Sequence, residues 1–87
     1  MVRRWEVDVL REGDIFVTRF DHDSFLYKGV RPTGLYNIGH GQVCLVLRAS
    51  KVEREFQYLT LLLPDGKVIR TGFSRSTAED DIDILVR

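Results

Sequence analysis

Apolar and polar residues along this chain form five short segments separated by turn-forming residues. The segments are rich in β-branched, aromatic and leucine side chains, which favour pleated strands over helices. Their ranges are 14–20, 42–48, 55–63, 67–73 and 81–86. The second is almost continuously apolar, as in a strand covered on both faces, whereas the last alternates like a half-buried strand. Since no window of ten or more residues has an amphipathic helical pattern, the sequence predicts an all-β protein.

The clearest turn signal is Pro64-Asp65-Gly66, which stands between two apolar runs. Proline fixes φ for the first turn position, and glycine supplies the positive φ with which the returning strand begins. The sequence therefore predicts a β-hairpin that joins 55–63 to 67–73.

The segment 2–10 carries two patterns. Trp5, Val7 and Val9 alternate as they would in a strand, but apolar residues also recur at helical spacing. We favour a strand here.

Two connections also carry a pattern. Thr77, with Asp80 three residues later, predicts one short helical turn before the last strand. Residues 21–41 hold four of the seven glycines, one of the two prolines and both histidines, which predicts a long irregular loop.

The order of these elements resembles that of the SH3-like barrel, in which a long loop follows the first strand and a helical turn precedes the last. The resemblance implies a small all-β, SH3-like barrel of five strands, or six if the N-terminal segment adds one. Closure would also hide the strand edges that a short open sheet exposes. The first strand reads Ile15-Phe16-Val17-Thr18-Arg19-Phe20 and lacks the Ala-Leu-Tyr-Asp-Tyr type motif of peptide-binding SH3 domains, so their activity is not expected here.

Several short pieces of the chain are similar to short uncharacterised proteins of tailed bacteriophages, including cyanophages. The similar pieces are Gly13-Asp14-Ile15, Gly41-Gln42-Val43-Cys44-Leu45-Val46-Leu47, Leu63-Pro64-Asp65-Gly66-Lys67-Val68 and Asp81-Ile82-Asp83-Ile84-Leu85. They encode strands and turns, and the resemblance implies no function.

Composition limits the class of protein. With 87 residues, 44% of them apolar and 30% charged, the chain is expected to form one globular domain over residues 1–87. No apolar run approaches the roughly 20 residues that a membrane helix needs, and no signal-peptide segment is present. A single cysteine fits a reducing compartment, so we expect a cytoplasmic protein, in the host cytoplasm if a phage encodes it.

Catalytic and metal-binding signals are weak. Asp21-His22-Asp23 and His40 have the chemistry of metal ligands, but no paired cysteine or His-x₃-His spacing accompanies them. Cys44 lies in the most apolar segment, where cysteine behaves as a small hydrophobic residue. We therefore expect no enzyme activity, catalytic residue, metal site or cofactor.

Two binding hypotheses remain. In the first, the long loop 21–41 contacts a protein partner or a second copy of the chain, because tyrosine and arginine are favoured anchors. Its contact residues would be Tyr27, Lys28, Arg31 and Tyr36, together with Phe25. Pinning of Phe25 and Tyr36 over the barrel mouth is the competing structural explanation for these aromatic side chains.

The second hypothesis is a nucleic-acid interface on a basic face, with Tyr58 or Phe73 as a stacking surface. This face would hold Arg48, Lys51, Arg54, Lys67 and Arg70, with Arg75 nearby. The net charge is zero, with 13 basic and 13 acidic residues, so only local clustering would attract a phosphate backbone. On the sequence alone, a non-enzymatic protein-interaction module is the first prediction and nucleic-acid binding is the alternative.

Overall fold

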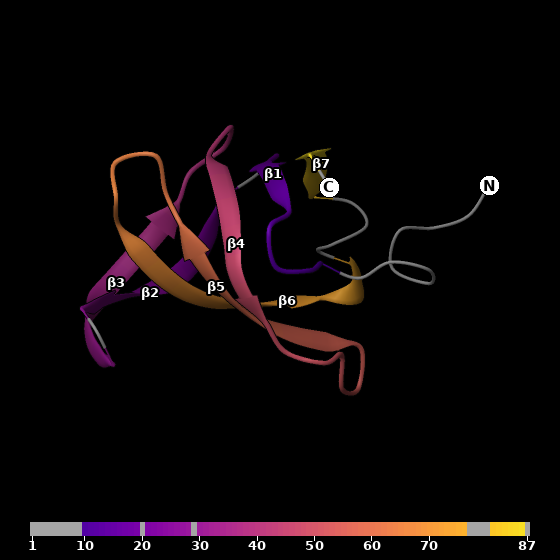
Figure 1. Cartoon of the computed structure of the whole chain (residues 1–87), viewed down its shortest axis with the longest axis horizontal. Helices are drawn as coiled ribbons and strands as arrows, with labels where there is room; N and C mark the ends of the chain where they lie inside the picture. The colour runs from indigo at the N-terminus through magenta and orange to yellow at the C-terminus, as the bar shows by residue number, and fades with distance from the viewer. Residues whose placement is uncertain (1–9, 20, 29, 77–80, 87) are drawn as a thin grey trace.

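A computed structural model of the chain describes residues 10–19, 21–28, 30–76 and 81–86. These residues form seven β-strands (Figure 1). In chain order the strands are β1 (Ile15–Thr18), β2 (His22–Lys28), β3 (Arg31–Ile38), β4 (Val43–Ala49), β5 (Phe56–Leu62), β6 (Val68–Ser74) and β7 (Ile82–Val86). The all-β prediction is confirmed.

All seven strands belong to one antiparallel sheet with the order β3-β2-β6-β5-β4-β1-β7. The β5–β6 hairpin lies in the middle of this order and has the longest continuous pairing, from Phe56↔Ser74 to Leu62↔Val68. Strands β3 and β7 are the two ends of this order, so the sheet has an edge at each of them.

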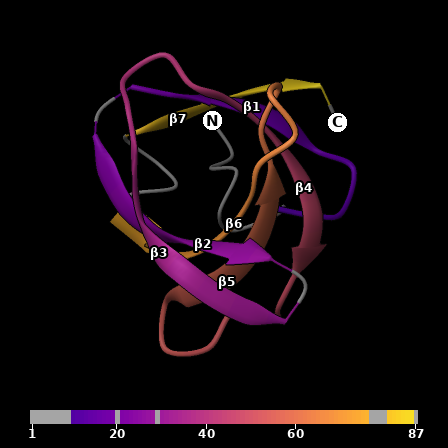
Figure 2. The same cartoon turned by 90° about the vertical axis from the view of Figure 1, so that its left-hand side faces the viewer.

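The sheet curls around its core, so that strands far apart in the sheet order face each other (Figure 2). Phe16 on β1 and Phe73 on β6 are in edge-to-face contact, with ring centroids 5.8 Å apart. In a flat sheet, strands three places apart would be separated by about 14 Å. The contact between these two fully buried rings therefore requires a strongly curved sheet.

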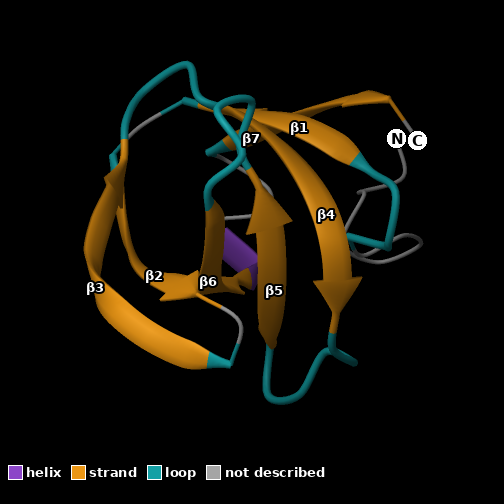
Figure 3. Ribbon diagram, turned by 60° about the vertical axis from the view of Figure 1, so that its left-hand side comes forward, coloured by secondary structure: helices purple, strands orange, loops and turns teal. Residues whose placement is uncertain are grey.

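The inner face forms a single apolar core. Alternate residues of each strand point into it, and Figure 3 shows the strands arranged around this interior. The core consists of Leu10, Phe16, Ile38, Cys44, Val46, Leu59, Leu61, Leu63, Ile69, Phe73 and Ile82. Since most inner positions are apolar, the alternate positions of β2, β6, β5 and β4 form an outer face whose side chains are available for other contacts.

The predicted hairpin at Pro64-Asp65-Gly66 is confirmed. The amide of Gly66 donates to the carbonyl of Leu63 over 2.9 Å, which closes a tight turn, and the amide of Leu63 donates to the carbonyl of Lys67. Gly66 has a φ of 91°, the conformation for which glycine was expected at this position.

The predicted long loop at 21–41 is wrong: β2 and β3 form a hairpin there, paired from His22↔Ile38 to Lys28↔Arg31. The count of five or six strands is therefore also too low. The usual alternation of apolar and polar residues is missing from the β2 sequence, because a polar residue, Ser24, occupies a buried position. Its hydroxyl donates to the carbonyl of Tyr36 over 2.8 Å. The proline and glycine within β3 suggested a loop, but an edge strand tolerates both.

Two further predictions lie partly outside the described residues. A helical turn begins at Arg75 and Ser76, directly before the last strand, and its predicted continuation through Thr77 and Asp80 falls in the range 77–80. The N-terminal segment 2–10 is described only at Leu10, which is buried in the core.

Candidate functional site

The strand register places four side chains in one row across the outer face. Arg48 on β4 is paired with Thr60 on β5, Thr60 with Arg70 on β6, and Arg70 with Phe25 on β2. Paired residues of antiparallel strands project to the same side of a sheet, so the four side chains share one surface. Tyr27, two residues beyond Phe25, extends the surface along β2.

Aromatic and cationic groups dominate this surface, which we call the aromatic–arginine face. It consists of Phe25, Tyr27, Arg48, Tyr58 and Arg70. Together with Thr60 and neighbouring residues of β4, β5 and β6 they line a hollow of about 650 Å³. Tyr58 is 68% exposed and Phe25 is 52% exposed, so two large rings lie at the surface and line the same hollow as the two arginines.

Ring contacts order the side chains of this surface. The guanidinium carbon of Arg70 lies 4.3 Å from the centroid of the Tyr27 ring, within the range of a cation–π interaction. Tyr58 is in edge-to-face contact with Phe56, with centroids 5.1 Å apart. The Phe56 ring in turn covers Gly72, where any side chain would meet it. The rings of Tyr27 and Tyr58 are therefore held in place by neighbouring side chains.

The charge of the face is not neutralised locally. Within the described part of the chain, neither Arg48 nor Arg70 has a carboxylate within ion-pair distance. Ion pairs elsewhere use other basic residues, as in Arg75 with Glu55. The residues that line the hollow include two arginines and no acidic side chain. As far as the described residues show, this hollow is thus a locally positive surface on a chain whose net charge is zero.

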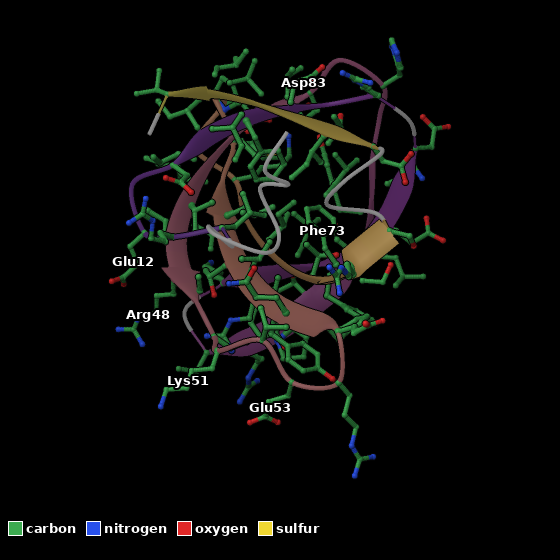
Figure 4. All side chains as sticks on the ribbon, turned by 90° about the vertical axis from the view of Figure 1, so that its right-hand side faces the viewer. Glu12, Arg48, Lys51, Glu53, Phe73 and Asp83 are labelled. Atoms are coloured by element: carbon green, nitrogen blue, oxygen red, sulfur yellow. The ribbon has the colours of Figure 1, made fainter. Side chains whose placement is uncertain are left out.

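The residues of the predicted basic face lie in two separate regions, one near the β4–β5 connection and the outer face, the other at the β5–β6 turn. Arg48 and Arg70 lie on the face, and Lys51 lies on the β4–β5 connection, where it points into solvent on the same side as Arg48 (Figure 4). Arg54 lies at the tip of that connection, close to Glu53. The set therefore does not form one continuous basic face.

Lys67 belongs to the opposite end of β5, in the β5–β6 turn. It forms an ion pair with Asp65, whose carboxylate raises the pKa of Lys67 through a hydrogen bond and Coulomb attraction. Its ammonium nitrogen also lies 5.8 Å from the centroid of the Tyr36 ring.

The predicted protein-binding set is also divided. Tyr27 belongs to the aromatic–arginine face, and Lys28 and Arg31 lie at the tip of the β2–β3 hairpin. Tyr36 is paired with the buried Ser24, so its ring lies on the inner side and packs against the core. Tyr36 therefore packs inward as part of the β2–β3 hairpin, whereas Phe25 projects outward.

Of the two predicted stacking residues, Tyr58 is exposed on the face. Phe73, labelled in Figure 4, is 1% exposed and belongs to the core. The expectation for Phe73 is wrong because it follows Gly72 on β6 and therefore points to the opposite side. The sequence did not single out Thr60, whose place in the row depends on strand register.

Chemistry at Cys44 is suppressed by its surroundings. The thiol is fully buried, and desolvation raises its pKa to about 12, so the nucleophilic thiolate is disfavoured. Among the described residues, no three His, Cys, Asp or Glu side chains gather as metal ligands would. No helix in the described ranges combines the length and apolar character of a membrane span.

Comparisons with known proteins give no assignment: no protein-family model matches the chain, and neither a curated protein nor a solved structure matches it significantly.

Proposed function

We propose that this chain is a small, non-enzymatic binding module of SH3-like architecture, and that its aromatic–arginine face binds single-stranded nucleic acid. The observation that carries the proposal is the joint placement of Arg48, Arg70 and exposed rings around one hollow. A curved sheet with a tight β5–β6 hairpin and a helical turn before the last strand supports the architecture. A cytoplasmic location belongs to the same proposal, because a lone thiol suits a reducing compartment.

Single strands offer what this surface can bind. Each unstacked base presents a flat π-face, and stacking on an aromatic side chain contributes about 1–3 kcal/mol per base. Arginine binds phosphate through several donors and also stacks on rings. The bases of a duplex are already stacked on one another, so an intact double helix cannot use Tyr58 or Phe25 in this way.

The test is fluorescence anisotropy with a labelled oligothymidylate of about ten nucleotides, titrated over a range of salt concentrations. Affinity should fall with salt, and replacing both Arg48 and Arg70 by glutamine should reduce the logarithmic salt slope by about 1.4, or 0.7 per phosphate contact. Tyr58→Ala should weaken binding by about fivefold or more.

Lys67→Gln is the matched control, since Lys67 is paired with Asp65 and lies at the other end of β5. It should leave the slope unchanged. Absence of binding, binding that salt does not affect, or equal effects of the control and the double variant would refute the proposal.

Protein binding remains a second candidate, and the position of β3 favours it. Among the strands that the structure describes, β3 lies at one edge of the sheet, so one side of its backbone is available for an added strand. Capture experiments with nuclease-treated lysate should lose the partner with Leu35→Lys on β3 and retain it with Leu85→Lys on β7. Loss with both variants, or with neither, would contradict docking at β3.

A further inference from the structure

The edge strand β3 has the properties of a self-complementary interface. It spans eight residues, most of them exposed, and among the described strands it is paired with β2 alone, on one side. An edge of this length presents unpaired backbone donors and acceptors to another strand. We infer that two copies of the chain pair antiparallel through β3, about a two-fold axis near Leu35. This inference rests on protein binding at the β3 edge, the second candidate function, and it identifies the protein partner as a second copy of the chain.

The distribution of charge along the β2–β3 hairpin indicates that the strand that pairs with β3 comes from a second copy of the chain. Its tip carries Lys28 and Arg31, whereas Asp21 and Asp23 are at the opposite end, and all four are exposed. In an antiparallel pair the basic tip of each copy lies beside the acidic end of the other. The complementarity therefore occurs twice, as a two-fold interface requires.

The middle of the strand is apolar. Leu35 is 74% exposed and is paired with Phe25 across β2. Pairing about Leu35 would bring the two copies of this side chain together and place a Phe25 on either flank. Pro32 has no amide hydrogen to donate, and in a pair about Leu35 it would be opposite Ile38, so the ladder is confined to Thr33–Asn37.

Such a dimer would also join the two outer faces. The row from Arg48 through Thr60, Arg70 and Phe25 would continue, through Leu35, into the same row reversed in the second copy. Two aromatic–arginine faces would then lie on one continuous sheet.

The first experiment is sedimentation equilibrium over a series of protein concentrations. The wild-type chain should dimerise, and Leu35→Lys should raise the dimer dissociation constant at least about tenfold. Leu85→Lys, at the other edge of the sheet on β7, is the matched control and should leave it unchanged. A wild-type chain that stays monomeric throughout the series, or equal effects of both variants, would overturn the inference.

The second experiment is a charge exchange. Arg31→Glu and Asp21→Lys should each weaken the homodimer, because like charges then face each other at both ends. A mixture of the two variants should form heterodimers about as tightly as the wild type, since every tip is again opposite its complement. Circular dichroism of each variant at low concentration verifies folding.

Rescue in the mixture supports β3 pairing, and its absence with folded variants overturns it. Oligonucleotide binding by the monomeric Leu35→Lys variant reports separately on the aromatic–arginine face, so the two proposals can fail independently.

Discussion

The guanidinium of Arg70 lies over the ring of Tyr27, with its central carbon 4.3 Å from the ring centroid. The two residues come from adjacent strands, β6 and β2, and the register that pairs Phe25 with Arg70 brings them together. This contact holds the guanidinium against the Tyr27 ring on the outer face, and an arginine that contacts a ring through its face keeps N–H donors for an anion.

Tyr27→Leu should therefore weaken binding of a single-stranded oligonucleotide by about two- to fivefold, since exposed cation–π contacts contribute about 0.5–1 kcal/mol. Tyr36→Leu is the control, because Tyr36 is packed on the inner side beneath Lys67. Anisotropy titrations of the two variants at one salt concentration measure the difference. Equal losses of affinity would show that the Arg70–Tyr27 contact plays no part in binding.

Gly72 should be intolerant of a side chain. A Cβ at this position would lie 2.2 Å from Cε1 of Phe56, so the ring would have to leave its place beside Tyr58. We expect Gly72→Ala to lower the free energy of unfolding by about 1 kcal/mol or more in urea titrations.

Gly34→Ala provides the comparison, since a Cβ there meets nothing within 4 Å and φ is not in the left-handed region. It should leave stability unchanged or slightly higher. In a Phe56→Ala background the cost of Gly72→Ala should disappear, and a cost that persists would assign the effect to the backbone of β6.

The tip of the β4–β5 connection is strained. Arg54 and Glu55 have φ values of 51° and 62°, and reciprocal backbone hydrogen bonds between Glu53 and Phe56 close a two-residue turn around them. Asn and Gly are the residues that such a turn prefers.

Arg54→Asn should raise the free energy of unfolding by about 0.5–1 kcal/mol, whereas Arg54→Val should lower it, because a β-branched residue tolerates positive φ poorly. Thermal unfolding of both variants tests this prediction. Equal melting temperatures would show that the turn relaxes in solution.

Burial of Cys44 predicts a dependence of stability on alkaline pH. Desolvation raises the pKa of the folded thiol to about 12 from its ordinary value of 9.0. Between these values the unfolded chain has lost the proton and the folded chain retains it. The stabilisation is therefore complete below pH 9 and is lost as the pH rises toward 12, by at most about 1.4 kcal/mol per pH unit.

The difference in unfolding free energy between wild type and Cys44→Ala should shrink as pH rises from 8 to 10.5, through the ordinary pKa of 9.0. A difference that does not change with pH would show that the thiol ionises without hindrance in the folded state. As a second readout, iodoacetamide should modify Cys44 only in denaturant.

The sequence by itself determined the local features. Runs of β-branched and leucine residues predicted five of the seven described strands, and Pro64-Asp65-Gly66 predicted the β5–β6 hairpin, because side-chain sterics and glycine's positive φ act within a few residues. It also showed that Cys44 lies in an apolar strand and is a poor nucleophile. These conclusions depend only on neighbours in the chain.

Only the tertiary structure decided which residues share a surface. Arg48, Arg70 and Tyr27 come from three strands, and a shift of one residue in any register would turn a side chain to the other face. The same dependence on register placed Tyr36 on the inner side and made an edge strand of a segment that composition marked as a loop. Because pairing partners are distant in the chain, the aromatic–arginine face could not be deduced from local pattern.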